Sequence, residues 1–223
     1  MKKLSWLARP AKVAFPVAKA GYPFIFIAAL ATAVFAFWGL DSLALIGLAV
    51  TFFICYFFRD PDRVAPNHKG VVVSPADGKV VAVDQVDTSR FFEGMCTKIS
   101  IFMSLFNVHV NRIPHEGFVE KVSYYPGKFF LANLDKASRE NEHNAIYLET
   151  IDGKKMCIVQ IAGLIARRII CKVQEGDKVD RGQRFGMICF GSRLDVYLPA
   201  DSKLNVAVGD RVKAGISVLG YLT

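Results

Sequence analysis

Hydrophobic and polar positions divide the chain into two parts with different periodicities. Between residues 22 and 58 almost every position is apolar, apart from a turn-like Gly-Leu-Asp-Ser at 39–42. This turn separates two apolar blocks, 22–38 and 43–58, each slightly shorter than the roughly 20 residues that a full membrane span needs. The pattern predicts a hydrophobic helical hairpin.

Beyond residue 62 the chain changes to short β-branched runs separated by Gly, Asp-Gly and Pro. Such punctuation is typical of an all-β sandwich or barrel. Residues 128–140 are instead expected to form a short helix or an ordered loop. We expect strands at 71–74, 79–83, 97–101, 119–124, 145–149, 155–161, 169–173 and 185–190.

An internal repeat refines this fold class. The heptapeptide GDKVDRG at 176–182 recurs as GDRVKAG at 209–215, and each copy lies between two hydrophobic strands. Flanking glycines permit the unusual backbone angles of a tight turn. Duplicated hairpins of this kind are typical of lipoyl-like and biotinyl-like domains. We therefore predict a mainly β, barrel-sandwich domain with an internal hairpin repeat, preceded by the helical hairpin.

Composition supports this division into an anchor and one domain. The 223 residues are 52% hydrophobic and 22% charged, with the apolar excess concentrated in one block. We divide the chain into a basic N-terminus at 1–21, a membrane hairpin at 22–58 and a β-rich domain at 59–223. Basic residues flank the hairpin on both sides, so the positive-inside rule places both its ends, and the domain, on the cytoplasmic face of the cell membrane.

The N-terminal region has two other possible interpretations. A cleaved signal peptide is disfavoured because the apolar region is long and contains a second block. A single tilted span remains an alternative, and it would place the domain on the opposite side of the membrane from the basic N-terminus.

Charge and cysteine content restrict the function classes. The net charge of +8 suits an anionic partner. Nucleic acid is not expected, because the basic residues are not interleaved with aromatic ones. The five cysteines form no C-x-x-C pair and suggest buried thiols in a reducing compartment. The sequence contains no zinc-like spacing, Walker loop or dinucleotide fingerprint, so we expect no metal.

One Gly-Ser pair stands in an informative place. Gly191 and Ser192 lie between two strand-like runs and between the two copies of the repeat. Taken locally, Ser192 reads as a turn serine in a glycine-rich hairpin. The surrounding motifs change that interpretation.

Six motifs in register resemble the short bacterial and archaeal branch of the phosphatidylserine decarboxylase family. The resemblance runs from about residue 20 to the C-terminus. The motifs are FFRDPDR at 57–63, SPADGKV at 74–80, FNVHVNRIP at 106–114, NEHN at 141–144, IAGLIARRI at 161–169 and FGSR at 190–193.

The resemblance implies a self-processing enzyme with a pyruvoyl cofactor derived from Ser192, without metal or pyridoxal phosphate. In such an enzyme Ser192 would attack the carbonyl of Gly191, and the chain would be cut into 1–191 and 192–223, which are expected to remain together as a heterodimer. A higher homo-oligomer is left open. The expected reaction converts phosphatidylserine to phosphatidylethanolamine and CO₂ at the membrane surface, with the phospholipid and the membrane as partners.

Two further catalytic residues follow from the same resemblance. His109 is the expected acid or base; strand alternation would place it on one face with Asn107. A histidine in such a run is more often a packed core residue, and the family motif reverses that reading. Asp77 has ordinary turn chemistry in Pro-Ala-Asp-Gly, but the family places an aspartate here in a processing triad with histidine and serine.

Several cations and one amide are candidates for substrate binding. Arg112 stands where the longer bacterial branch has a second histidine, and an arginine cannot readily act as a base. We expect the phosphate or carboxylate of the head group to be bound by Arg112, Arg167, Arg168 and Asn107. His143 stands where family members usually have arginine, and His68 and His115 are expected at the surface.

Two alternative functions are compatible with parts of this pattern. The first is the same chemistry on an archaeal-type serine phospholipid. The second is a non-catalytic, membrane-tethered lipoyl-like adaptor. A carrier domain needs a modifiable lysine at the tip of the repeat hairpin, in a pattern that neither copy contains.

Overall fold

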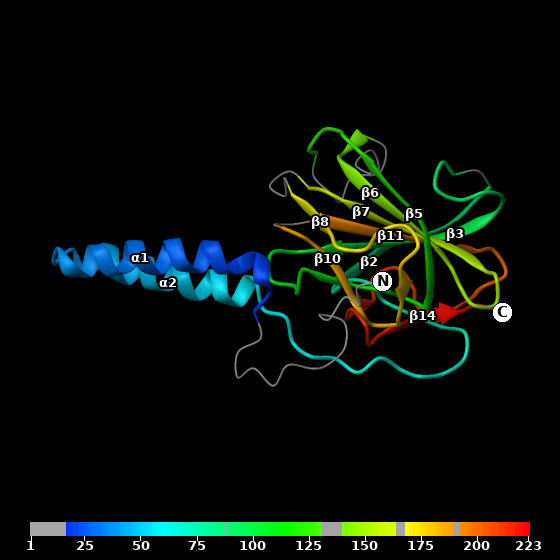
Figure 1. The fold of residues 1–223 in the computed structure, drawn as a ribbon, viewed down its shortest axis with the longest axis horizontal. Helices are drawn as coiled ribbons and strands as arrows, with labels where there is room; N and C mark the ends of the chain where they lie inside the picture. Colours follow the sequence, from blue (N-terminus) through cyan, green and yellow to red (C-terminus); the bar gives the residue numbers. More distant parts are fainter. Residues whose placement is uncertain (1–16, 88, 131–139, 164–167, 190–191) are drawn as a thin grey trace. The chain divides into compact units, whose positions relative to one another are not determined.

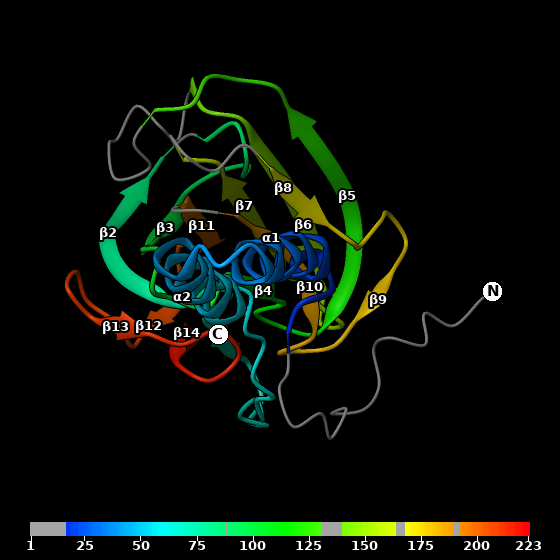
Figure 2. The same ribbon diagram turned by 90° about the vertical axis from the view of Figure 1, so that its left-hand side faces the viewer.

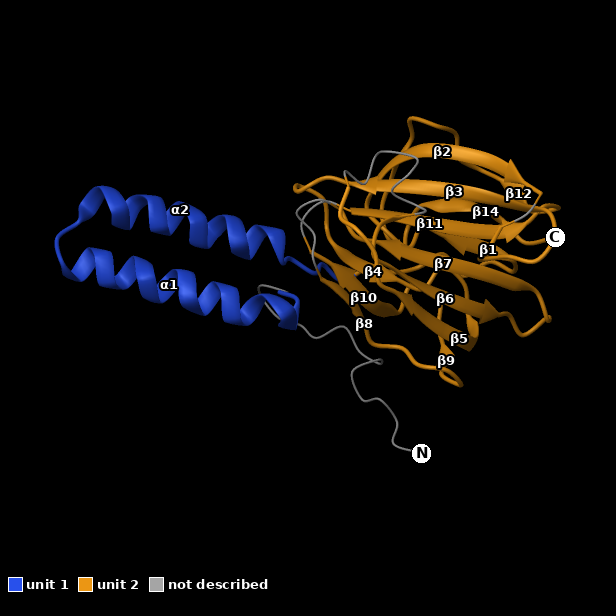
Figure 3. Ribbon diagram, turned by 90° about the horizontal axis from the view of Figure 1, so that it is seen from above, with its two compact units in different colours: residues 1–62 blue, residues 63–223 orange. Residues whose placement is uncertain are grey.

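A computed structural model describes residues 17–87, 89–130, 140–163, 168–189 and 192–223. The chain divides into two compact units, Met1–Asp62 and Arg63–Thr223 (Figure 3). The first contains the helices and the second contains the strands.

The first unit is a pair of apolar helices. After a short 3-10 helix at Lys19–Gly21, helix α1 spans Tyr22–Phe37 and helix α2 spans Asp41–Phe57. The turn between them contains Gly39 at φ 70°, in the left-handed region that glycine adopts readily. The predicted helical hairpin is confirmed.

Small side chains allow the two helices to approach closely. Thr32 Oγ1 and Thr51 Oγ1 lie 3.4 Å apart across the pair. A Cβ added at Gly47 would lie 2.6 Å from Thr32 Oγ1, so only glycine fits there without a shift. Small residues at helix contacts are typical of membrane-embedded pairs.

The apolar character of the pair suits an anchor. The helical stretch Lys19–Phe37 has 19 residues and a mean hydropathy of 1.9, long and apolar enough to cross a membrane. Helix α2 is apolar but shorter. By length and composition, one helix of the described residues is therefore able to span or anchor in a bilayer.

The second unit is mainly β, as predicted. The strands of its described residues form three sheets, one with eight strands in the order β13-β2-β3-β11-β7-β6-β5-β9, and two with three strands, β1-β14-β12 and β4-β10-β8. The large sheet is curled into a half-barrel (Figures 1 and 2). The strands are β1 Val71–Val73, β2 Gly78–Val86, β3 Cys96–Met103, β4 Val110–Arg112, β5 Gly117–Tyr125, β6 His143–Glu149, β7 Lys155–Ile161, β8 Ile169–Cys171, β9 Lys178–Val179, β10 Arg184–Ile188, β11 Ser192–Pro199, β12 Lys203–Leu204, β13 Arg211–Val212 and β14 Val218–Tyr221.

The strands repeat as two halves. From one edge to its centre the large sheet has the order β13-β2-β3-β11, and from the other edge it has the order β9-β5-β6-β7. Strands at the same place in these two series are equivalent. The small sheet β1-β14-β12 is equivalent to β4-β10-β8 in the same order. One half is the continuous stretch β4–β10. The other half combines β1–β3 with β11–β14. The hairpin repeat predicted from the sequence is thus part of a larger duplication.

The two copies of the predicted repeat make the same hydrogen bonds. Gly176 donates to the carbonyl of Val119 at 2.8 Å, and Gly209 donates to the carbonyl of Val80 at 2.9 Å. The aspartate after each glycine accepts a backbone N–H from three residues earlier, at 2.9 Å in both copies. The four glycines that flank the copies have φ between 71° and 106°. The predicted turn function of these glycines is confirmed.

A second repeat was missed in the sequence. PADGKV at 75–80 recurs as PHEGFV at 114–119, at the start of β2 and β5. The halves exchange backbone bonds here: Val73 donates to the carbonyl of Pro114 and Arg112 to that of Pro75, both at 2.9 Å. A Cβ on the glycine of either copy would lie 2.2 Å from a carbonyl oxygen of the neighbouring strand. Close strand approach therefore explains this glycine.

Strand β11 lies at the centre of the large sheet and is buried on both faces. Leu194, Val196 and Leu198 belong to the main core, between the large sheet and the small ones. Tyr197 belongs to a smaller cluster on the opposite face, with Phe91. Most of the expected helix or loop at 128–140 lies outside the described residues.

Candidate active site

Ser192 is the first residue of β11. It lies opposite Met103, the last residue of β3. Its side chain is fully buried, and within the described residues its Oγ has no hydrogen-bond partner. Gly191, the other half of the expected cut, lies outside the described residues. A hydroxyl buried without a partner costs about 1–3 kcal/mol and calls for an explanation.

A buried amide chain lies next to Ser192 and was missed in the sequence. Asn111 Nδ2 donates to the Sδ of Met103 at 3.8 Å. Gln160 Nε2 donates to Asn111 Oδ1 at 2.9 Å and is itself joined to Asn144 at 3.2 Å. The three amides are buried. They fall inside or beside the motifs at 106–114, 141–144 and 161–169, which is the signal that could have identified them.

A buried ion pair lies on the other face of β11. Arg193 Nε donates to Asp195 Oδ1 at 2.6 Å, and Arg193 Nη2 donates to Ser100 Oγ at 2.7 Å. The arginine and aspartate side chains are only 2% and 0% exposed. Arg193, which follows Ser192, is therefore held by strand pairing and by its bonds to Asp195 and Ser100.

His109 is fully buried and directly precedes β4. The expectation that it shares a strand face with Asn107 was wrong. Asn107 lies in a turn, where its Oδ1 accepts the N–H of Ser104 at 2.9 Å and the Oγ–H of Ser104 at 2.8 Å. The asparagine side chain closes the turn, so the strand begins only after His109.

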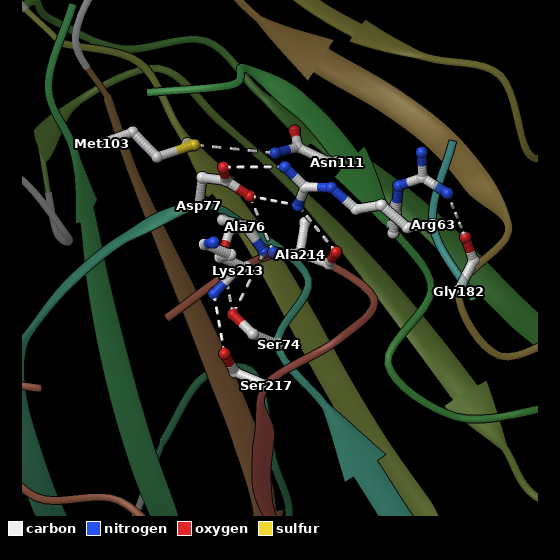
Figure 4. Close-up of polar contacts among 11 residues, drawn as sticks. Arg63, Ser74, Ala76, Asp77, Met103, Asn111, Gly182, Lys213, Ala214 and Ser217 are labelled. Carbon is white, nitrogen blue, oxygen red and sulfur yellow. Dashed lines mark hydrogen bonds and ion pairs between the residues drawn. The ribbon is translucent and has the colours of Figure 1, made fainter. Parts of the chain in front are cut away.

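Both carboxylate oxygens of Asp77 are engaged (Figure 4). Oδ1 accepts from Arg63 Nη1 and from the backbone N–H of Ala214 at 2.8 Å. Oδ2 accepts from Arg63 Nη2 at 2.9 Å. Gly78 packs against the carbonyl of Phe102, so Asp77 lies close to the end of β3 that faces Ser192.

The candidate substrate-binding arginines lie in different surroundings. Arg112 is buried, and its Nη1 donates to the carbonyl of Gly182 at 3.0 Å. Arg168 is exposed, one residue before β8. Arg167 lies outside the described residues. Arg168 is thus exposed to solvent, whereas Arg112 is buried.

His143 is packed among aromatic rings. Its ring stacks on that of Tyr125 with centroids 4.8 Å apart, and its Nδ1 lies 2.6 Å from the carbonyl of Asn141, a contact that requires Nδ1–H. Burial lowers the pKa of His143, against the opposing effect of this hydrogen bond. The pKa of His143 is therefore below the ordinary histidine value, and the ring packs against those of Tyr125 and Phe91.

The two remaining histidines differ from each other. His68 is exposed, as expected. His115 was expected at the surface, but it is buried, with its Nδ1 2.8 Å from the carbonyl of Glu116. The second repeat explains the difference, because it places His115 at the base of β5, next to the position equivalent to Asp77.

The cysteines are free thiols, and Cys96, Cys157 and Cys189 are buried. Burial raises the pKa of the Cys157 and Cys189 thiols. Among the described residues, no group of three or more histidine, cysteine or acidic side chains is arranged to hold a metal ion.

The surroundings of Ser192 fit a group made from its own side chain. The buried, unpartnered Oγ of the described structure lies at the start of a strand that two neighbours hold in register. A reactive group formed there would be shielded from bulk water. The amide of Asn111, two residues after His109, contacts Met103 at this end of β3.

Comparison with known proteins gives a consistent result. Residues 50–220 match the family model described as phosphatidylserine decarboxylase. A relative from Syntrophus aciditrophicus, called phosphatidylserine decarboxylase proenzyme, is 52% identical over 92% of this chain and 96% of its own. Relatives with the same name from Desulfotalea psychrophila and Geotalea uraniireducens are 49% and 50% identical, each over 93% of this chain and 97% of theirs.

Proposed function

Because the chain belongs to the phosphatidylserine decarboxylase family, we propose that it is a self-processing enzyme that converts phosphatidylserine to phosphatidylethanolamine and CO₂ with a pyruvoyl group made from Ser192. The observation that carries this proposal is the buried Ser192 Oγ, which has no hydrogen-bond partner among the described residues and directly follows a glycine. The proenzyme names of the relatives support the processing step.

The proposed self-cleavage begins when Ser192 Oγ attacks the carbonyl carbon of Gly191. The peptide C–N bond breaks, the serine nitrogen takes a proton, and an ester joins the two residues. A base then removes the Cα hydrogen of Ser192, the ester C–O bond breaks, and Gly191 leaves as a carboxylate. Water hydrolyses the resulting dehydroalanine with release of ammonia, which leaves the pyruvoyl group on the chain 192–223.

His109 is the proposed proton carrier for these steps. It is buried on the segment that leads into β4, and an imidazole can accept and return a proton near neutral pH. Asp77 is proposed to orient that imidazole, as the acidic member of a triad does. Arg112 is unsuited to act as a base because it stays protonated.

Once formed, the pyruvoyl ketone would supply an electron sink for the loss of CO₂ from the serine head group. The chain's own residues would hold that head group. Arg168 is proposed to bind its phosphate or carboxylate because it is exposed beside β8. Arg167, Arg112 and Asn107 are proposed for the same task.

The proposed site of action is the cytoplasmic face of the cell membrane. The helices α1 and α2 would form an anchor with both ends on that side, because basic residues flank the pair. An anchored enzyme suits a substrate whose acyl chains stay in the bilayer. The two products of self-cleavage would stay associated as a heterodimer.

The comparisons argue against the two alternatives considered for the sequence. Relatives about 50% identical carry the name of an enzyme, which disfavours a non-catalytic adaptor. The same names refer to phosphatidylserine, which favours this lipid over an archaeal-type one.

A decarboxylation assay tests this function. Purified protein is mixed with vesicles that contain phosphatidylserine labelled in the serine carboxylate, and released CO₂ is counted. We expect turnover by the wild type and by Ser202→Ala, whose Oγ also has no partner among the described residues. Ser192→Ala is expected to release none. Normal turnover by Ser192→Ala would refute the cofactor assignment.

A further inference from the structure

The contact between Arg63 and Asp77 ties the chain that leaves the helical hairpin to the candidate active site. Arg63 uses its two terminal nitrogens on the carboxylate, and its Nη1 also donates to the carbonyl of Ala214 at 2.8 Å. The two side chains are 8% and 11% exposed. Arg63, Asp77 and Ala214 thus close a buried ring of hydrogen bonds that leaves the carboxylate a single orientation (Figure 4).

The other half of the duplication contains a matching pair. Glu116 is equivalent to Asp77, and Arg181 donates to its two oxygens at 2.8 Å and 2.7 Å. Arg181 comes from the hairpin repeat, at the position equivalent to Ala214. One half therefore supplies its cation from the hairpin. The other half has alanine there and obtains its cation from outside the duplication, at Arg63.

The pair Arg63–Asp77 lies near Ser192, whereas the pair Arg181–Glu116 lies at the opposite end of the large sheet's strands. Gly78, next to Asp77, packs against the carbonyl of Phe102, and the residue after Phe102 pairs with Ser192. Glu116 precedes the strand end where Phe118 pairs with Glu149, at the other end of β6 from His143. Only the first of these two ion pairs is thus placed to act on the cut.

We propose that Arg63 is a positioning residue for self-cleavage: it holds the Asp77 carboxylate in the orientation that the reaction at Ser192 requires. This inference rests on the proposed function.

The test follows conversion of the newly made full-length chain into 1–191 and 192–223 by intact mass spectrometry over time. Arg63→Ala is expected to slow conversion by about 10- to 100-fold, the cost of a small misplacement of a reacting group. Arg63→Lys keeps the charge without the two-pronged contact, and it is expected to be intermediate in rate.

Arg181→Ala is the matched control. It removes a two-pronged pair whose arginine is similarly buried, at 6% exposed, and whose glutamate is 36% exposed. It also frees the segment around residues 66–68, whose carbonyls accept from Arg181. We expect a similar loss of thermal stability and near wild-type conversion. Addition of guanidinium ion at millimolar concentration is expected to speed conversion of Arg63→Ala and to leave Arg181→Ala unchanged, a difference that lost stability cannot produce.

The outcomes are distinguishable. If the wild type stays uncut, the proposed function fails. If the wild type is cut and Arg63→Ala is cut at the same rate, the positioning role of Arg63 is wrong. If Arg63→Ala does not fold, Arg63→Lys decides, and a wild-type rate for it would overturn the proposal.

Discussion

Asp77 and Glu116 occupy equivalent positions in the two halves of the β-domain, and each accepts hydrogen bonds on both carboxylate oxygens from one arginine. The equivalence shows that an acidic residue at this position has a structural use, independent of chemistry. Burial would raise the pKa of Glu116, but bonds from its own backbone N–H and from Arg181 lower it. The proposed catalytic use of Asp77 would be an addition to that structural use.

The pair Arg193 and Asp195 is expected to matter for stability. Removing one partner of a buried ion pair leaves an uncompensated charge, so Asp195→Ala should cost about 3–5 kcal/mol. The double variant Arg193→Met/Asp195→Leu should regain most of that loss. Thermal unfolding of the single and the double variant, each made in the uncut Ser192→Ala chain, measures these changes in the free energy of unfolding. A loss below about 1 kcal/mol for Asp195→Ala would contradict the assigned role.

His143 is expected to make the fold sensitive to mild acid. Its pKa is lowered in the folded protein, so the unfolded chain binds more protons as pH falls below the ordinary histidine value of about 6.5. Stability conferred by the neutral ring is complete above that value and is lost as pH falls toward the lowered pKa. Melting temperatures between pH 8 and 5 should fall less steeply for His143→Asn than for wild type. His68→Asn, at an exposed position, should keep the wild-type slope.

The two threonines of the helical hairpin offer a test of its packing. Because Thr32 Oγ1 and Thr51 Oγ1 are 3.4 Å apart, Thr32→Cys/Thr51→Cys should form a disulfide readily under oxidation. The variant is made in a Cys55→Ala background and oxidised in membranes. The chain is then cut between the two helices, and a gel shows whether a disulfide still joins the two fragments. Thr32→Cys/Phe52→Cys, with the second cysteine on a more exposed face, is the control. Equal cross-linking in both would show that the helices do not pack as described.

The small chain is expected to remain bound after cleavage. Its first strand, β11, pairs on both sides with strands of the large chain, β3 and β7. Both faces of β11 are also buried. The two chains should therefore co-elute in size-exclusion chromatography in mild detergent and separate only in denaturant. Separation without denaturant would contradict the central position of β11.

The sequence predicted the class of the fold because its signals were local. The apolar blocks at 22–38 and 43–58 and the glycine-flanked repeat each report on a few neighbouring residues, and the structure confirms both. The full duplication was missed because its halves are interleaved: β11–β14 complete a half that starts with β1–β3. Only the fold brings these segments together.

The candidate site was predicted less completely. The motif at 106–114 pointed to His109, but the turn that Asn107 closes was not anticipated. The contact between Arg63 and Asp77 joins two different motifs, at 57–63 and 74–80, and no spacing within either one signals it. Long-range pairs of this kind depend on tertiary structure, which sequence periodicity does not encode.

The central claim is that Ser192 becomes the cofactor, and intact mass spectrometry of the purified wild-type protein tests it most directly. The account predicts two chains, 1–191 and 192–223, with the smaller one blocked at its N-terminus and reactive toward a hydrazide reagent. A single unmodified chain of 223 residues that nevertheless releases CO₂ from phosphatidylserine would contradict the account.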